Sequence, residues 1–243
     1  MSLFTISDLH LSMHEQTNKS MEIFGKRWED YVHRLEKNWR AVVTENDTVV
    51  IPGDISWAID LNEAISDLKF IDSLPGKKIL GKGNHDFWWT TMSKHRAFFD
   101  LHGITTISFL FNNFHETEEY LIAGTRGWYL EADAMKNVTP VDFEKIIARE
   151  VGRLKTSLNA AKERQSAVPE KEILVFLHFP PYWNEKCTPG IYELLKEYAI
   201  KQIYYGHIHN TYNLPPTSVS DEMCFHLISA DYLDFLPKII KNG

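Results

Sequence analysis

The sequence predicts an α/β protein, because short β-favouring runs alternate with helical patterns and polar clusters follow several of these runs. Residues 3–7 and 48–51 are two such runs, and the charged, amphipathic stretch 19–45 between them predicts a helix. A β-α-β opening of this kind favours a parallel sheet. In an open α/β sheet, ligands bind beyond the carboxyl ends of the strands. The polar clusters are therefore the first place to look for function.

The alternation of strands and helices continues along the chain. Its next expected members are a helix near 61–73, a strand at 77–80, a helix near 92–102 and a strand at 104–109. After these we expect a strand at 120–123, a helix over 142–164, a strand at 173–177, a helix at 191–198, a strand at 202–205 and a last strand at 224–229. The apolar tail 235–240 is expected to pack on its own domain. With no repeat or linker in the sequence, we predict a single domain over 1–243.

Composition excludes several classes of protein. A chain of 243 residues with 44% hydrophobic residues can bury a large core, and its net charge of -7 argues against general nucleic-acid binding. Cys187 and Cys224 form no CxxC pair, which favours a reducing compartment. The sequence shows no signal peptide and no apolar stretch long enough for a transmembrane segment, so we expect a cytoplasmic location. The composition does not indicate an oligomeric state.

Side chains that bind metals recur where the predicted strands end. These clusters are SDLHLS with Asp8 and His10, PGD with Asp54, GNHD with Asn84, LHFPP with His178, and GHIH with His207 and His209. Asp, Asn and His supply the oxygen and nitrogen ligands that Mn, Fe and Zn accept. Each cluster alone is as readily a turn, a cap or a surface residue. Their recurrence after one strand after another instead predicts a divided metal site.

Two features of these clusters bear on geometry and chemistry. Glycines at 53, 83 and 206 precede the polar residues, and glycine allows strained backbone angles or close approach to a ligand. In GNHD, His85 is a titratable imidazole, and Asp86 could orient it as in base and orienter pairs. The alternative is an Asx turn with Asp86 as a helix cap. The spacing of GHIH allows either one shared ion or two ions about 3.5 to 4 Å apart.

The ordered set DLH, GD, GNHD, His-Phe-Pro and GHIH resembles the calcineurin-like metallophosphoesterase superfamily over residues 8–209. The resemblance implies an α/β sandwich of β-sheets flanked by helices, with two divalent or transition metal ions (Mn, Fe or Zn). It also implies that Asp8, His10 and His209 hold the first ion, that Asp54 bridges, and that Asn84, His178 and His207 hold the second. His85 would then be the general acid, with Asp86 behind it. Many members have Gly before the histidine that corresponds to His178, where this chain has leucine.

The implied activity is metal-dependent phosphoester hydrolysis by a water or hydroxide held between two metals. Its expected substrate is a phosphorylated small molecule or nucleotide. One alternative is a pyrophosphatase that acts on a nucleotide-linked lipid precursor, because SDLHLS resembles the opening of such enzymes. Another is a non-catalytic scaffold with a degraded metal site, although every ligand position is kept here.

Aromatic residues and one arginine accompany the clusters. They could line a substrate pocket, but each alone is more readily explained by packing in the core or in a turn. These aromatic residues are Trp57, Phe87, Trp88, Trp89, Trp128, Tyr129, Tyr182 and Trp183. Arg126 could bind a substrate phosphate bidentately, or it could pair with an acidic residue at the surface.

Overall fold

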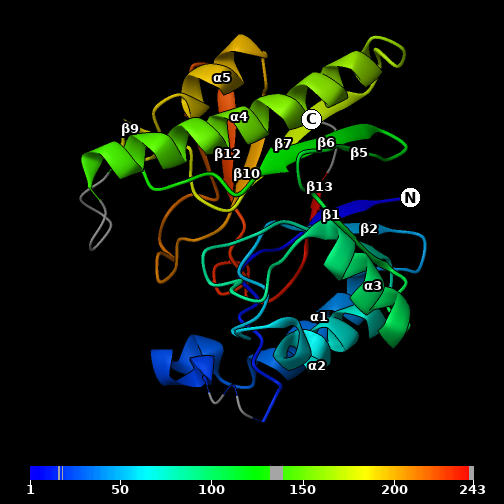
Figure 1. Ribbon diagram of the computed structural model, residues 1–243. Coiled ribbons are helices and arrows are strands. Elements are labelled where there is room, and N and C mark those ends of the chain that lie inside the picture. Colours follow the sequence, from blue (N-terminus) through cyan, green and yellow to red (C-terminus); the bar gives the residue numbers. More distant parts are fainter. Residues whose placement is uncertain (16, 18, 132–138, 241–243) are drawn as a thin grey trace.

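Two β-sheets stacked between helices form the molecule (Figure 1). The computed structural model describes residues 1–15, 17, 19–131 and 139–240. The first sheet has the strand order β13-β1-β2-β3-β4 and the second sheet has the order β11-β12-β10-β7-β6-β5. A short hairpin of β8 (Tyr182–Trp183) and β9 (Lys186–Cys187) stands apart from both sheets.

The strands of each sheet have the following bounds. The first sheet consists of β1 (Leu3–Thr5), β2 (Thr48–Ile51), β3 (Lys77–Leu80), β4 (Ile107–Phe109) and β13 (Lys238–Ile240). The second sheet consists of β5 (His115–Glu116), β6 (Tyr120–Thr125), β7 (Glu172–Leu177), β10 (Gln202–Tyr205), β11 (Thr217–Ser220) and β12 (Met223–Leu227).

The central strands of both sheets run parallel, and antiparallel strands occur only at the edges. In the first sheet β1, β2, β3 and β4 are parallel, and β13 pairs antiparallel with β1. In the second sheet β6, β7, β10 and β12 are parallel, whereas β5 and β11 are antiparallel. The carboxyl ends of the parallel strands therefore meet at one edge of each sheet, as the β-α-β pattern predicts.

Alternating side chains hold the two sheets together. Within β2, Val50 faces the other sheet while Val49 and Ile51 face the helices, because successive residues of a strand point to opposite faces. The core between the sheets joins Val50 and Ile79 of the first sheet to Phe176 of the second. These side chains are almost completely buried.

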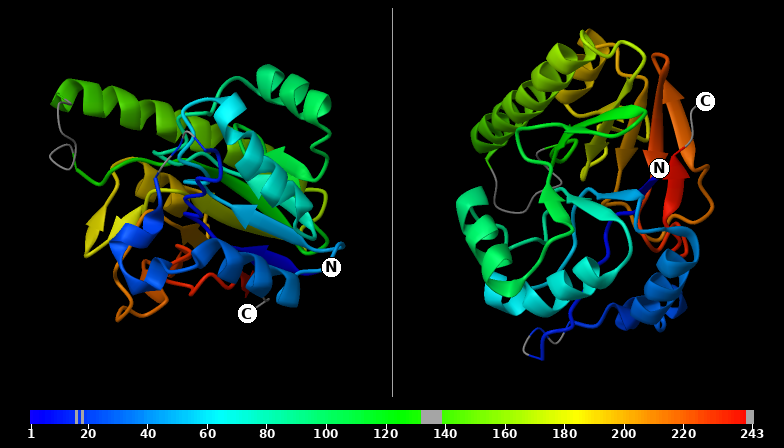
Figure 2. Two further views of the ribbon diagram at one scale, coloured as in Figure 1. Left: turned by 90° about the horizontal axis from the view of Figure 1, so that it is seen from below. Right: turned by 90° about the vertical axis from the view of Figure 1, so that its right-hand side faces the viewer.

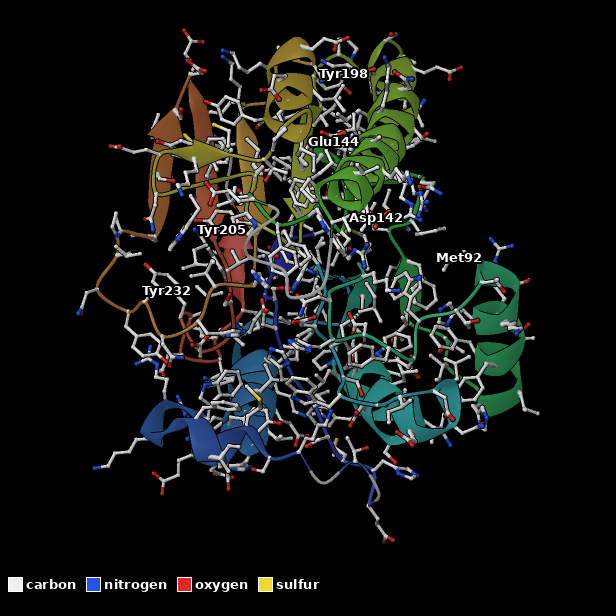
Figure 3. The ribbon with its side chains drawn as sticks, turned by 60° about the vertical axis from the view of Figure 1, so that its left-hand side comes forward. Met92, Asp142, Glu144, Tyr198, Tyr205 and Tyr232 are labelled. Atoms are coloured by element: carbon white, nitrogen blue, oxygen red, sulfur yellow. The ribbon has the colours of Figure 1, made fainter. Side chains whose placement is uncertain are left out.

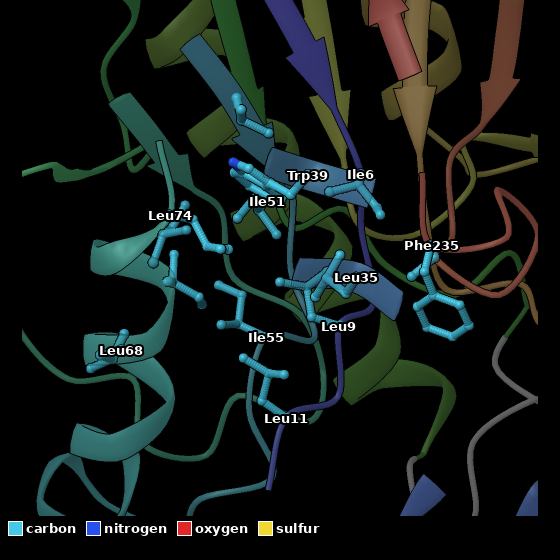
Figure 4. Packing of buried hydrophobic residues seen from close by; sticks show 14 of the residues in the cluster. Ile6, Leu9, Leu11, Leu35, Trp39, Ile51, Ile55, Leu68, Leu74 and Phe235 are labelled. Atoms are coloured by element: carbon cyan, nitrogen blue, oxygen red, sulfur yellow. The ribbon is translucent and has the colours of Figure 1, made fainter. Parts of the chain in front are cut away.

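Helices cover the outer face of each sheet (Figure 2). The first sheet packs against α1 (Tyr31–Val42), α2 (Leu61–Ser73) and α3 (Met92–His102), and the second against α4 (Pro140–Gln165) and α5 (Ile191–Glu197). Figure 4 shows side chains of α1, such as Leu35 and Trp39, converging with Leu68 of α2 on the first sheet. Figure 3 shows side chains filling the molecule between α3, marked by Met92, and α5, which ends near Tyr198.

Local signals set the helix ends. The Asp60 carboxylate accepts hydrogen bonds from the backbone N–H groups of Asn62 and Glu63 and so caps α2. Proline is the first residue of α4, where it needs no intrahelical donor. Gly103, in the left-handed region with φ of 68°, ends α3. None of the described helices is long and apolar enough to cross a bilayer.

The α/β alternation and the sandwich architecture are confirmed, but several details of the sequence prediction were wrong. The expected helix over 19–45 contains two short 3-10 helices, Met21–Phe24 and Lys26–Trp28, before α1 begins at Tyr31. Gly25, with φ of 114°, and Asp30, with φ of 49°, interrupt it. The strand at 224–229 is not the last, because β13 adds an edge to the first sheet. The edge strand β11 was also missed, since its Thr-Ser-Val-Ser sequence has little hydrophobic signal.

Candidate metal centre

Every predicted ligand follows a parallel strand at its carboxyl end. Asp8 and His10 follow β1, Asp54 follows β2, and Asn84 follows β3, the next strand along. On the second sheet, His178 follows β7, and His207 and His209 follow its neighbour β10. The structure therefore brings side chains from both sheets together where the two sheets meet.

One group of nitrogen and oxygen atoms gathers around His10. Its Nε2 lies 3.2 Å from Nε2 of His209, and Nε2 of His209 lies 3.4 Å from Oδ1 of Asp8. Ligand atoms of these three residues all lie within 4.8 Å of one another, which is compatible with one shared ion. These are the residues predicted for the first ion.

A second group gathers around Asn84. Its Oδ1 lies 2.8 Å from Nε2 of His178 and 3.0 Å from Nδ1 of His207. These three residues were predicted to share the second ion. An amide oxygen faced by two imidazole nitrogens offers three ligand atoms that point at one region.

Asp54 lies between the two groups. Its Oδ2 is 3.7 Å from Nε2 of His10 and 3.4 Å from Nε2 of His178. Asp8 also belongs to both candidate ligand sets, once with His10 and His209 and once with Asp54 and His178. Both aspartates are therefore positioned to interact with cations in either group.

The electrostatics of the cluster fit a cation. Burial, together with the neighbouring carboxylates of Asp8 and Asp86, raises the pKa of Asp54 well above its ordinary value. A divalent ion would relieve this repulsion, because an adjacent positive charge favours ionised carboxylates. Burial lowers the pKa of His10 to about 3 and that of His207 to about 4, so both imidazoles are neutral at pH 7, as ligands must be.

His209 differs from the other histidines of the cluster. Burial would lower its pKa, but hydrogen bonds and charges from Asp231 and Asp8 outweigh that effect and raise the pKa to about 10. Without a metal, His209 therefore carries an extra proton at neutral pH. A metal ion that binds its Nε2 would displace that proton.

Several of the predicted ligands have a strained backbone conformation. Asp8, His10, Asp54 and His207 have φ values of 60°, 47°, 50° and 68°, in the left-handed region that residues other than glycine rarely adopt. Such strain costs about 1–3 kcal/mol per residue and tends to cluster at functional sites. Here each strained residue lies just beyond the end of a parallel strand.

Glycine serves close approach at all three predicted positions. A Cβ at Gly53, which has a φ of 116°, would overlap the backbone of Lys82 and Gly83. A Cβ at Gly83 would overlap the backbone and the carboxylate of Asp54, and one at Gly206 would overlap Asp8 and Ser7. Neither Gly83 nor Gly206 lies in the left-handed region. Only a residue without a side chain lets these loops come so close.

The carboxylate of Asp86 lies among backbone N–H groups and not beside the His85 ring. The Asp86 carboxylate accepts hydrogen bonds from the backbone N–H groups of Gly83, Asp54, Ile55 and Ser56 and from Nε1 of Trp88. Among the described hydrogen bonds, none joins Asp86 to the His85 ring. Asp86 instead ties the loop after β3 to the loop after β2, a task that a sequence motif does not reveal.

His85 lies at the open side of the cluster. Its backbone N–H donates to Oδ1 of Asp54 at 2.8 Å, and its Nε2 lies 4.0 Å from Oδ2 of the same residue. The ring packs on Trp57 with a centroid distance of 4.3 Å. Its side chain is 36% exposed, whereas those of His10 and His178 are almost completely buried. His85 is therefore a histidine that a substrate could reach.

Asp231 is a residue that the sequence reasoning missed. It is fully buried, and its Oδ1 lies 2.8 Å from Nδ1 of His209. Its Oδ2 accepts hydrogen bonds from the backbone of Asn210 and the hydroxyl of Tyr212. A carboxylate behind a ligand imidazole fixes the ring and leaves its other nitrogen for the metal. The signal was present, because Asp231 follows the predicted strand 224–229 as the other ligands follow theirs.

Of the aromatic residues and the arginine that accompany the clusters in the sequence, some pack in the core and others line the site. Trp88 is buried in the core, while Trp57 lines a cavity of about 260 Å³ together with His10, Asp54 and His85. Arg126 pairs with the buried carboxylate of Glu150 at 3.3 Å, in line with the acidic-partner alternative.

The chain belongs to the calcineurin-like phosphoesterase family, whose model matches residues 1–211. No curated protein sequence matches it significantly.

Solved structures share its fold. A phosphopantetheinyl hydrolase (PptH) from Mycobacterium tuberculosis is similar with 13% identity and a TM-score of 0.57, covering 100% of this chain and 96% of that one. The protein TT1561 of Thermus thermophilus is similar with 9% identity and a TM-score of 0.55, covering 98% and 97%. At these identities the likeness concerns the fold alone.

Proposed function

We propose that this protein is a metal-dependent phosphohydrolase that acts on phosphoesters of small or nucleotide-type molecules. The observation that supports this most is the convergence of Asp8, Asp54, Asn84 and four imidazoles at the junction of the sheets, in a chain of the phosphoesterase family. Buried carboxylates and neutral imidazoles suit Mn, Fe or Zn. The metal identity, the cytoplasmic location and the single-domain organisation are further expectations of the same proposal.

The chain's own residues would divide the work as follows. Asp8, His10 and His209 would hold one ion and Asn84, His178 and His207 the other, with Asp54 between them. When bound, such a pair of ions supplies hydroxide near neutral pH and neutralises charge on the phosphoryl group. His85, exposed beside Asp54, would donate a proton to the leaving oxygen.

Metal content and turnover test this proposal together. The purified protein should hold close to two transition ions per chain, and the Mn-loaded protein should hydrolyse members of a panel of phosphomonoesters, phosphodiesters and nucleotide pyrophosphates. The name of one fold neighbour adds phosphopantetheinyl esters to the panel. A protein without stoichiometric metal and without turnover would instead be a scaffold that keeps the fold alone.

The role of His85 can be separated from metal binding. His85→Ala should keep its metals but lose about 10²- to 10⁴-fold in rate on alkyl esters, and much less on nitrophenyl esters, whose leaving groups need little protonation. Asn84→Ala should instead weaken the second ion and slow all substrates alike. His33→Ala, which changes an exposed histidine on α1, is the control. Loss of metal from the His85 variant, or equal slowing of both ester types, would show that His85 is not the general acid.

A further inference from the structure

Two cavities adjoin the candidate metal centre and share one lining residue, His207. The first, of about 260 Å³, is lined by His10, Asp54, His85 and His209 together with apolar side chains. The second, of about 280 Å³, is lined mainly by aromatic and other apolar side chains. His207 lines both, so the phosphoryl site lies where the two cavities meet.

The first cavity continues into an apolar groove. Met21, Phe24 and Trp57 line it and also line an adjoining hollow of about 420 Å³, which adds Ile23 and Lys19. Ile23 and Phe24 are exposed, and both belong to the 3-10 helix that follows β1. Trp57 is stacked on His10 at 4.9 Å and lies under the Lys19 ammonium at 4.8 Å, so its ring already has stacking partners. This groove suits an extended, largely apolar group better than a stacked nucleobase.

The two cavities differ in one catalytic respect. His85 lines the first and does not line the second. Because a general acid must reach the oxygen that it protonates, the departing alcohol belongs in the first cavity. A group in the second cavity would remain attached to phosphorus.

The second cavity would have no occupant in a phosphomonoester. Tyr129, Phe179 and Trp183 form its apolar wall, and Asn184 and Lys186 add polar atoms. Phe179 packs on the His207 ring with a centroid distance of 4.3 Å, so this wall reaches the metal centre itself. Mostly apolar cavities with a few polar groups are typical sites for organic ligands.

Building on the proposed function, we propose that the substrate is a phosphodiester with two organic substituents. Its leaving alcohol, extended and apolar, lies in the first cavity and groove, and its retained substituent lies against Phe179 and Trp183. In the reaction, the oxygen of water forms a bond to phosphorus and the bond from phosphorus to the alcohol oxygen breaks. That oxygen takes a proton from His85, the proton of the attacking water passes to solvent, and the products are a phosphomonoester and an alcohol.

Two substrate series with the Mn-loaded protein test the two halves of the proposal, the leaving alcohol in the first cavity and the retained substituent in the second. With nitrophenol as the constant leaving group, nitrophenyl phosphate is compared with its methyl and phenyl diesters. With methyl as the constant retained group, 4-methylphenyl and 4-hexylphenyl leaving groups of nearly equal acidity are compared. We expect kcat/KM to rise from the monoester to the diesters, and to rise at least about tenfold from the methyl to the phenyl diester and from methylphenyl to hexylphenyl, because burial of a few carbon atoms provides such a factor.

Variants then assign each gain to its cavity. Trp183→Ala should reduce the gain from the phenyl group, and Phe24→Ala the gain from the hexyl chain. Leu101→Ala, which shortens an exposed apolar side chain on α3, should change neither gain. If Trp183→Ala reduces the hexyl gain in kcat/KM, if Phe24→Ala reduces the phenyl gain, or if either variant reduces both gains equally, the assignment of the two substituents to the two cavities is overturned.

The wild-type series decides the proposal even if a variant fails to fold. A monoester preference, or no gain in either series, overturns the diester inference and leaves the phosphohydrolase proposal standing. Absence of turnover with every phosphoester would overturn the proposed function itself.

Discussion

The two sheets contribute different chemistry to the same site. The first sheet supplies the candidate oxygen ligands, Asp8, Asp54 and Asn84, and one buried imidazole, while the second supplies imidazoles alone. Their supports differ as well. Asp86 binds backbone N–H groups of two first-sheet loops, whereas Asp231 binds the ring of a second-sheet ligand. The first-sheet half of the site is therefore fixed through main-chain hydrogen bonds, and the second-sheet half through a hydrogen bond to a side chain.

This difference shows why the site requires the whole sandwich. Asp8 accepts the backbone N–H of His207, so the two halves are hydrogen-bonded to each other at the ligands themselves. The carboxylates would repel one another without the histidines of the second sheet and a cation. Changes at the junction should therefore have larger effects than changes in either half.

The largest effect is expected for Gly206→Ala, at the junction itself. The added Cβ would overlap the Asp8 carboxylate and Ser7, so the two loops must move apart. We expect metal binding to weaken by more than about 100-fold, beyond the range for outer-shell changes, with a loss of about 1–3 kcal/mol in the free energy of unfolding. Calorimetric metal titration and denaturant unfolding measure both.

Gly152→Ala is the matched control for this substitution. Gly152 lies inside α4 with nothing near its Cβ position, so alanine should stabilise the helix by about 0.5–1 kcal/mol. Unchanged metal affinity in Gly206→Ala would show that the two halves are not in the tight contact described.

Asp86→Ala should mainly destabilise the first half. It leaves several buried N–H groups without an acceptor, and each unsatisfied group costs about 1–3 kcal/mol. We expect the free energy of unfolding to fall by at least about 3 kcal/mol, with weaker metal binding as a consequence. An Asp86→Ala protein of wild-type stability that lost only the leaving-group dependence of its rate would restore the orienting role behind His85.

Asp231→Asn should weaken the second half more selectively. Loss of the carboxylate behind His209 should reduce metal affinity by about 10- to 100-fold, the usual range for such partners. The pKa of His209 should also fall from about 10, which ring NMR resonances in the metal-free protein would report. Asp221→Asn, at an exposed turn before β12, is the control. Equal metal affinity in wild type and Asp231→Asn would contradict this role.

The smallest effect is expected far from the junction, at Glu116 of β5. Hydrogen bonds and charges from Arg164 and Lys171 lower its pKa to about 2. Since the folded pKa lies below the unfolded value, the stabilisation is complete above the unfolded pKa and is lost as pH falls toward 2. Glu116→Gln should therefore lower the unfolding temperature slightly at pH 7 and less at pH 3, with metal binding unchanged. An equal change at both pH values would contradict this ion-pair contribution.

Particular residues show how much of the fold and of the site can be predicted from the sequence. The candidate ligands could be predicted because each follows a strand, and the alternation of strands and helices is a local pattern. The support by Asp86 was not visible, because its partners are backbone groups about thirty residues away in the chain. The strand β13 was missed because its pairing with β1 joins the two ends of the described chain, and no local period encodes such a contact. Asp231 stood at a strand end and could have been found by the same rule as the ligands.

Crystallography of the Mn-loaded protein, with anomalous scattering to locate the ions, tests the central claim most directly. The account predicts two ions within about 4 Å of each other, with Asp54 between them, the first held by residues of both sheets and the second likewise. Asp54→Ala should then lose both metal and activity. One isolated ion, or an Asp54 side chain that points away from the metals, would contradict the account.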